Sequence, residues 1–211
     1  SKAPQRTRIV IGVTWCRISD FKHMDGVYIN PNGHIVSDIA LAPSDSNTIY
    51  VSFNALSTCC NTFLFKTTTG GMSCSGNCGE PQGPQAWKVL TNIPHISTGD
   101  SHQDFIENGF NYIKSITISD KDPNVLWIGF GTDKLDKIDF KVYRSNDGGE
   151  SWLPDEEGLP DYPVTKIIYV NGSNNELFLG TWNGVYYKKV DSPCQKYGTG
   201  LPHAYVSEME M

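Results

Sequence analysis

The sequence has no excess of positive charge. Its 17 lysine and arginine residues are outnumbered by 23 aspartate and glutamate residues, which gives a formal net charge of −6 at pH 7. Proteins that bind nucleic acid generally need a basic face that neutralises phosphates. We therefore expect no nucleic-acid partner for this chain.

Long apolar runs and helical periodicity are also missing. No apolar stretch approaches the roughly 20 residues that a membrane-spanning helix requires, so we expect no membrane span. Nothing reads as a long amphipathic helix. The 20 glycines, the 12 prolines and an aromatic content of 11% are instead typical of a turn-rich all-β protein.

The six cysteines do not form a recognisable metal-binding pattern. Cys74 and Cys78 enclose three residues, and glycine and proline flank the segment, which indicates a small disulfide-closed surface loop. Zinc is the alternative for such a pair, but it needs further ligands at related spacing, and adjacent Cys59 and Cys60 match that need poorly. We expect a Cys74–Cys78 disulfide and therefore an oxidising compartment. The pairing of the other cysteines stays open, namely Cys16, Cys59, Cys60 and Cys194.

A two-strand unit recurs along the chain. An alternating strand, a polar turn with Asp and Asn and a second apolar strand occupy residues 37–53, and the same order returns at 114–130 and 165–181. A further first strand begins at Val206. Equivalent anchors lie 77, 51 and 42 residues apart, which fits one supersecondary unit with variable loops and not a rigid solenoid. The anchors are Ile39, Ile116, Ile167 and Met209.

The N-terminal residues resemble the middle of such a unit. Residues 8–15 are similar to 176–182, a second strand, and residues 26–29 are similar to 184–187, a third strand. The sequence therefore predicts a chain that enters inside one four-stranded unit and leaves inside another. The predicted units are a partial one at 8–34, units at 35–90, 112–160 and 163–200, and the start of another at 204–211.

Residues 145–152 form the most distinctive short motif, and we call them the box turn. Gly148 and Gly149 can take the positive φ angles of a tight turn between strands. Ser145 and Asp147 can hydrogen-bond the backbone of the same turn. The motif reads Ser145, Asn146, Asp147, Gly148, Gly149, Glu150, Ser151 and Trp152.

The order S-x-D-x-G-x-S-W resembles the Asp-box, the hairpin signature of sialidase-type and related β-propellers. Residues 63–71 align with 141–149, and Thr69 stands where Asp147 stands, so the first copy resembles an Asp-box without its Asp. A Cys-containing insertion separates this copy from Trp87. The resemblance implies that Asp147 is structural and that Trp152 and Trp87 belong to the core.

The resemblance implies an all-β fold, a β-propeller of four-stranded antiparallel blades. We expect this chain to be an incomplete part of the ring, with about two full and two partial blades, and the remainder to lie in the same or another chain. Propeller blades bury their faces against one another. An open ring is therefore expected to expose apolar side chains, such as Trp127, Phe130, Phe178 and Tyr186.

Three short stretches between predicted strands indicate which propellers the chain resembles. Residues 121–124, 157–160 and 180–185 are similar to Asp-box (BNR-type) propellers of secreted bacterial surface proteins, and more distantly to xyloglucanase-type, sortilin-type and sialidase propellers. This resemblance implies a secreted or cell-surface protein that serves as a non-catalytic scaffold or recognition module for protein or glycan ligands. The alternative is part of a glycoside hydrolase whose catalytic carboxylates lie partly outside this chain.

A glycoside hydrolase needs two carboxylates that face the scissile bond. Two loops supply candidates, but we favour a solvated surface segment as the explanation of either loop. A sialidase is disfavoured, because that family binds its substrate through three arginines and this chain has four, none in the expected motif. The candidate acids are Asp100, Asp104 and Glu107 in one loop, and Asp133 and Asp136 in the other.

The sequence contains no clear motif for a cofactor and only weak candidates for ligand binding. The acids between Asp133 and Asp139 lack the spacing of a calcium-binding loop, so we expect no cofactor, with calcium as the open alternative. Aromatic residues on predicted loops can stack on sugar rings, although propeller cores use aromatics as well. The candidates are Tyr162, Trp182 and Tyr197.

Overall fold

The structure is a computed structural model that describes residues 23–24, 27–28, 34–55, 62–70, 87–94, 111–132, 141–198 and 200–210. Across these ranges every regular element is a β-strand, and there is no helix. No helix that could cross a membrane occurs in the described part of the chain. The all-β class predicted from composition is therefore correct.

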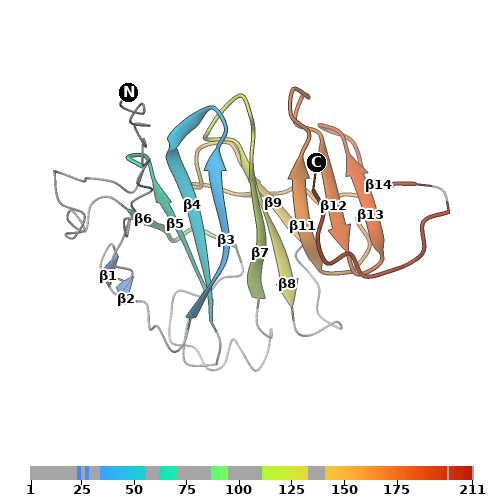
Figure 1. The fold of residues 1–211 in the computed structure, drawn as a ribbon, viewed down its shortest axis with the longest axis horizontal. Coiled ribbons are helices and arrows are strands. Elements are labelled where there is room, and N and C mark those ends of the chain that lie inside the picture. Colours follow the sequence, from blue (N-terminus) through green and yellow to red (C-terminus); the bar gives the residue numbers. More distant parts are fainter. Residues whose placement is uncertain are drawn as a thin grey trace, which may run out of the picture.

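Three four-stranded antiparallel sheets make up the fold, and each is a meander of consecutive strands (Figure 1). The first sheet holds β3 (His34–Ala42), β4 (Asp45–Ala55), β5 (Phe63–Thr67) and β6 (Lys88–Leu90). The second holds β7 (Asn111–Ile118), β8 (Leu126–Thr132), β9 (Val142–Ser145) and β10 (Leu153–Pro154). The third holds β11 (Val164–Tyr169), β12 (Leu177–Thr181), β13 (Gly184–Lys188) and β14 (Gln195–Lys196).

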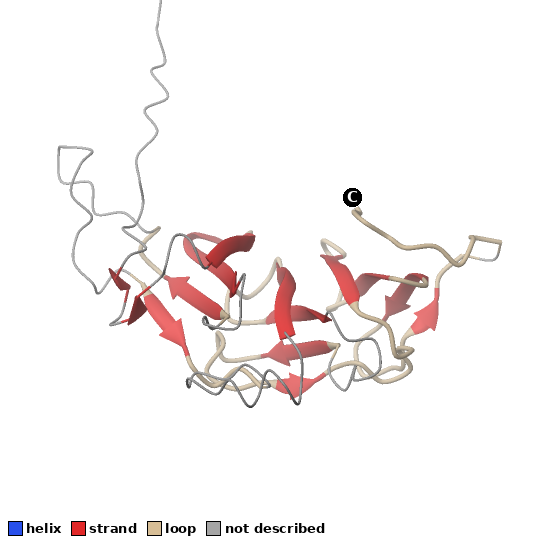
Figure 2. Ribbon diagram, turned by 90° about the horizontal axis from the view of Figure 1, so that it is seen from below, coloured by secondary structure: helices blue, strands red, loops and turns tan. Residues whose placement is uncertain are grey.

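The sheets stand side by side in an arc, which Figure 2 shows from below. First strands β3, β7 and β11 neighbour one another, so the sheets follow in chain order like the blades of a β-propeller. The structure has three complete sheets, whereas the sequence predicts two complete units and parts of others. The third is completed by the two-residue strand β14, which Cys194 directly precedes, whereas Trp87 and Trp152 directly precede the fourth strands of the other two sheets.

The chain ends differ from the predicted strands. Residues 204–210 are irregular, although Val206 N donates to Thr181 O at 3.0 Å. Strand β2 (Val27–Tyr28) falls within the predicted third strand at 26–29 but pairs with β1 (His23–Met24) in a two-stranded sheet. The predicted second strand at 8–15 lies outside the described residues.

A β-bulge recurs at the same place in the first strand of each of the three four-stranded sheets. An extra residue reverses the alternation of side chains, so two residues three positions apart can point to the same face. The register shifts fall between Val36 and Asp38, between Ile113 and Ser115, and between Val164 and Lys166. The repeat detected in the sequence is therefore also a repeat of backbone geometry.

Two hydrophobic cores lie between neighbouring sheets. Ile113 and Phe130 belong to the core between the first and second sheets, and Trp127 and Tyr186 belong to the core between the second and third. Trp127, Phe130 and Tyr186 are 1%, 2% and 7% exposed. The expectation that an open arc would expose these three is wrong, because each faces a neighbouring sheet; Phe178 is half-buried.

Candidate functional site

Because each sheet is a meander, its connections fall on two opposite edges. The connections from first to second strand and from third to fourth strand form the turn edge, the upper edge in Figure 1. The connections from second to third strand and from one sheet to the next form the loop edge. Described parts of the turn edge are 43–44, 68–70, 119–125, 146–152, 170–176 and 189–194; those of the loop edge are 91–94, 155–163, 182–183, 197–198 and 200–205.

The Asp147 carboxylate closes the box turn on the turn edge. Its Oδ1 accepts hydrogen bonds from Ser145 Oγ at 2.8 Å and from Ser151 N at 2.9 Å, and its Oδ2 accepts from Ser151 Oγ at 2.5 Å. Ser145 Oγ in turn accepts from Gly149 N at 2.8 Å. The bonds from Ser151 contribute most to lowering the pKa of Asp147 to about 2, because they stabilise the ionised form.

The backbone conformation and packing of the box turn require glycine at positions 148 and 149. Gly148 and Gly149 have φ angles of 74° and 94°, which side-chain-bearing residues rarely adopt. Gly148 N donates to Asn124 O at 2.8 Å, which ties the box turn to the preceding turn of its own sheet. A Cβ on Gly149 would lie 2.4 Å from Leu90 Cδ1 of the first sheet. The box turn is therefore packed against its surroundings, and Trp152, which ends it, is buried.

The first sheet carries a reduced version of this turn. Thr67 and Thr69 share a hydroxyl–hydroxyl hydrogen bond of 3.2 Å, and Thr69 N donates to Thr67 Oγ1 at 3.2 Å. Gly70 N donates to Asn47 O at 2.7 Å, as Gly148 N does to Asn124 O. The backbone of the turn is thus kept where the carboxylate is absent.

The turn edge also joins neighbouring sheets. Between the first and second sheets, Tyr50 Oη donates to Pro123 O at 3.2 Å and Lys88 Nζ pairs with Glu150 Oε1 at 2.5 Å. Between the second and third sheets, Lys121 Nζ donates to Ser173 O at 2.6 Å. These contacts link neighbouring sheets along the turn edge.

In the third sheet, Lys188 occupies the position of Ser145 and makes a different link. Its buried Nζ lies 3.0 Å from Asp155 Oδ1 and donates to Ser192 O at 2.8 Å. Asp155 Oδ2 accepts from Trp127 Nε1 at 2.8 Å. Asp155 therefore connects the second sheet to the third through an ion pair that is largely removed from water.

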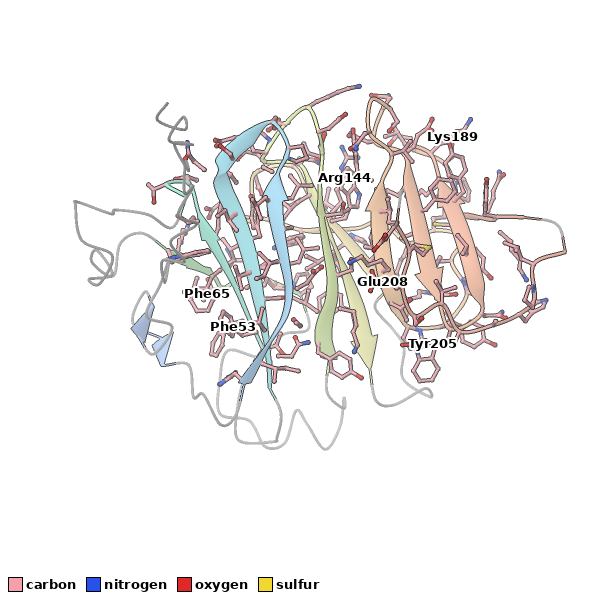
Figure 3. The ribbon with its side chains drawn as sticks, in the orientation of Figure 1. Phe53, Phe65, Arg144, Lys189, Tyr205 and Glu208 are labelled. Atoms are coloured by element: carbon pink, nitrogen blue, oxygen red, sulfur yellow. The ribbon has the colours of Figure 1, made fainter. Side chains whose placement is uncertain are left out.

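The loop edge presents aromatic rings to solvent. Trp182, in the turn between β12 and β13, and Tyr205 are 38% and 58% exposed. Their ring centroids lie 6.0 Å apart at 68°, and Tyr205 lies at the lower edge in Figure 3. Beside them Asn183 Oδ1 lies 2.7 Å from His203 Nδ1. The arrangement combines apolar ring faces with amide and imidazole groups.

The other aromatic candidates take different places. Tyr162 is exposed just before β11, on the loop edge. Tyr197 is also exposed, but its ring packs edge-on against Phe178 at 4.8 Å, so it belongs to a separate aromatic group. The sequence does not identify Tyr205 and His203 as site residues, because they follow Pro202 in an irregular segment without alternating apolar residues.

The candidate acids and the predicted disulfide lie outside the described residues, namely Asp100, Asp104, Glu107, Asp133, Asp136, Cys74 and Cys78. Thr132 ends β8 and Lys141 adjoins β9, and both lie at the loop edge of the second sheet. Among the described residues, no three His, Cys, Asp or Glu side chains gather to hold a metal. Cys194 is a free, buried thiol, and burial raises its pKa to about 11.

No protein-family model and no curated protein matches the sequence. Among solved structures, the chain is similar to the GH74 enzyme of Niastella koreensis (15% identity, TM-score 0.49), with 77% of this chain and 22% of that one covered. For an ancestral GH74 enzyme the identity is 20%, the TM-score 0.44 and the covered shares 75% and 18%. For the GH74 xyloglucanase of Xanthomonas campestris they are 12%, 0.49, 80% and 24%.

The chain thus spans about a fifth to a quarter of the length of these structures. At such identities and TM-scores the similarity says nothing about activity. The propeller architecture follows from the chain's own sheets, with their shared topology, shared bulge and successive face-to-face packing.

Proposed function

We propose that this chain is part of a secreted or cell-surface β-propeller, without catalytic activity of its own, that binds glycans at the loop edge. The observation that carries the proposal is the exposed pair Trp182 and Tyr205 beside Asn183 and His203. Aromatic faces offer a large apolar contact to a sugar ring, while nearby polar groups can pair with its hydroxyls.

The turn edge differs from the loop edge in a way that supports this assignment. Several of its polar groups are engaged in bonds within and between sheets, as the four bonds among Ser145, Asp147, Gly149 and Ser151 illustrate. We assign the box turn as an Asp-box with a structural role. A protein ligand would use the same exposed edge, and binding of a protein but of no glycan would replace the glycan part of the proposal.

A glycoside hydrolase is the second candidate. The observation that favours it is that Thr132, at the end of β8, and Lys141, just before β9, lie on the same edge as Trp182, and Asp133 and Asp136 follow Thr132 in the sequence. Hydrolysis needs one carboxylic acid as proton donor and one carboxylate as base or nucleophile. In that case Asp133 and Asp136 would be the first residues to test.

Binding is tested by titrating the protein with soluble xyloglucan and with cello-oligosaccharides in a calorimeter. Trp182→Ala is expected to weaken binding by up to about tenfold, since a stacked aromatic contact contributes about 0.5–1.5 kcal/mol beyond its buried area. Leu153→Ala is the matched control, because Leu153 is an exposed apolar residue on β10. Equal affinity of Trp182→Ala and wild type would contradict the proposed site.

The two candidates separate in a reducing-sugar assay with the same polysaccharides. The proposal predicts binding without product release. Release of sugar by the wild type, abolished in Asp133→Asn or Asp136→Asn, would establish the hydrolase instead.

A further inference from the structure

The C-terminal segment 206–209 repeats a four-residue sequence of β3. In both places a valine and a serine are followed by an acidic and then an apolar residue. In β3 these residues contain the β-bulge, whereas 206–209 is irregular. The matched residues are Val36, Ser37, Asp38 and Ile39 in β3, and Val206, Ser207, Glu208 and Met209 in the segment.

The segment lies on the third sheet, in the place where the first strand of a next sheet would lie. Val206 Cγ1 and Met209 Cε would be 2.9 and 3.2 Å from a Cβ on Gly180 of β12. The bulged part of β11 approaches the equivalent glycine of β8 as closely, although that position is Ser52 in the first sheet. Val206 N also donates to Thr181 O at 3.0 Å. The face of the third sheet that carries Gly180 therefore binds a first-strand sequence.

Strand β3 presents the same sequence to solvent. Val36, Ile39 and Leu41 are 47%, 54% and 58% exposed. The equivalents of the first two on β7 are Ile113 and Ile116, which are 0% and 6% exposed because they pack against the first sheet. Strand β3 therefore carries the apolar half of a sheet junction, and no four-stranded sheet of the described ranges covers it.

One hydrogen bond recurs at the two formed junctions. An amide of the following sheet donates to a side-chain oxygen on the first strand of the preceding sheet. Ile116 N donates to Asp38 Oδ2 at 2.7 Å, and Ile167 N donates to Ser115 Oγ at 3.0 Å. A formed junction thus sets an acceptor on the preceding sheet against an amide on the following one.

At the two open surfaces the polarity of this contact is reversed. The position of Asp38 is Lys166 in the third sheet, and a lysine side chain only donates. Lys166 Nζ lies 3.3 Å from Glu208 Oε1, and Glu208 is labelled in Figure 3. In β3, Ile39 N donates to Asp38 Oδ1 at 3.0 Å, so a carboxylate oxygen stands beside the amide that would serve a junction. The ammonium on one surface and the carboxylate on the other are complementary.

We propose that β3 of a second copy of this chain docks on the third sheet in place of residues 206–209. The apolar pair of β3 replaces Val206 and Met209, and Asp38 replaces Glu208 beside Lys166. A contact between two different surfaces of identical copies forms a closed ring or an open chain of copies. Propellers typically have about four to eight blades. Two copies of three sheets give a ring of six, so the assembly is a closed dimer with two identical junctions.

Residues 206–209 compete with the second copy for the same face. Their ion pair is weak, because the Glu208 side chain is 62% exposed and exposed ion pairs contribute little to stability. The segment therefore lowers the affinity between copies without preventing their association.

Reversal of the ion pair tests the proposal by sedimentation of the full chain over a range of concentrations. Glu208→Lys repels Lys166 and loosens the segment, so the dissociation constant of the dimer should fall by up to about fivefold. Adding Lys166→Glu restores the pair within one copy but repels Asp38 of the other, so the dissociation constant should rise above the wild-type value. Equal constants for the single and double variants would overturn the proposal.

Ile39→Arg tests the apolar part of the contact. It places a charge among apolar side chains, so this variant should sediment as a monomer of 23.4 kDa at every concentration. Leu153→Arg, at an exposed apolar residue on β10, is the matched control and should form the dimer as the wild type does. A wild type and a Glu208→Lys variant that both stay monomeric, a dimer that tolerates Ile39→Arg, or assemblies larger than a dimer would each overturn the proposal.

Discussion

The turn edge and the loop edge of the sheets are built from different interactions. On the turn edge, short hydrogen bonds and ion pairs close each turn and link it to the next sheet, as Asp147, Lys121 and Lys88 do. On the loop edge, Trp182 and Tyr205 leave their rings in solvent. One edge therefore holds the sheets together, and we propose that the other is free to bind a ligand.

One repeated position on the turn edge accepts chemically different residues in the three sheets. One position is Thr67 in the first sheet, Ser145 in the second and Lys188 in the third, and each is buried with its polar group bonded. A hydroxyl bonds within its own turn, whereas the longer Lys188 reaches Asp155 of the second sheet. In all three sheets the buried polar group at this position is hydrogen-bonded, although the residue that supplies it differs.

The largest effect of breaking a link between sheets is expected at the Lys188–Asp155 pair. Asp155→Ala should lower the free energy of unfolding by about 3–5 kcal/mol, because it leaves a buried ammonium without its partner. Lys188→Met should cost much less, since it removes the buried charge itself. Urea denaturation measures both, and equal losses in the two variants would contradict this account of the pair.

The next effect concerns the backbone of the box turn. Gly149→Ala should cost about 1–3 kcal/mol, because it combines a positive φ with a Cβ 2.4 Å from Leu90 Cδ1. Gly172→Ala isolates the φ contribution, since Gly172 has a φ of 77° and nothing within 4 Å of an added Cβ. Gly149→Ala should therefore be the more destabilised variant in urea, and the reverse order would show that Leu90 does not restrict the turn.

Removal of the carboxylate should have a smaller, pH-dependent effect. Asp147→Asn is expected to cost about 1 kcal/mol at pH 7, the usual contribution of such hydrogen bonds near solvent. Because the pKa of Asp147 is lowered from 3.8 to about 2 in the folded protein, its stabilisation is fully present above pH 3.8 and lost as pH falls through 2.

Thermal unfolding of wild type and Asp147→Asn between pH 2 and 7 checks this expectation. The difference in melting temperature should be constant above about pH 5 and shrink toward pH 2. Thr69→Ala, at the equivalent position of the first sheet, is the control, and its effect should not vary with pH, because no carboxylate is lost.

The smallest effect is a gain. Thr69→Asp restores a carboxylate to the reduced copy of the turn, where Thr67 supplies the hydroxyl and Gly70 already has a φ of 69°. We expect stabilisation of about 0.5 kcal/mol, comparable to one net hydrogen bond. Unchanged or lower stability would show that the two turns differ in more than the carboxylate.

Much of the fold could be predicted from the sequence, because it depends on local patterns. Alternating strands, polar turns and the box turn are properties of neighbouring residues, and they led to the sheets at 34–90 and 111–154. Strand β14 was not distinguishable, because two residues, Gln195 and Lys196, carry no alternation.

Contacts between distant residues could not be predicted. The Lys188–Asp155 pair joins residues of different sheets, and neither residue has a local signature. At the loop edge, Trp182 was a candidate from its exposed turn, whereas Tyr205 reaches it only because residues 200–210 fold back over the third sheet. Sequence patterns define the strands, and packing decides which side chains meet.

The most direct test of the division between edges compares one variant from each in the same glycan titration. Trp182→Ala should lose up to about tenfold in affinity for soluble xyloglucan or cello-oligosaccharides while keeping the wild-type melting temperature. Asp147→Ala should lose stability and keep the wild-type affinity. Weaker binding by Asp147→Ala with unchanged binding by Trp182→Ala would place the ligand on the turn edge and contradict the account.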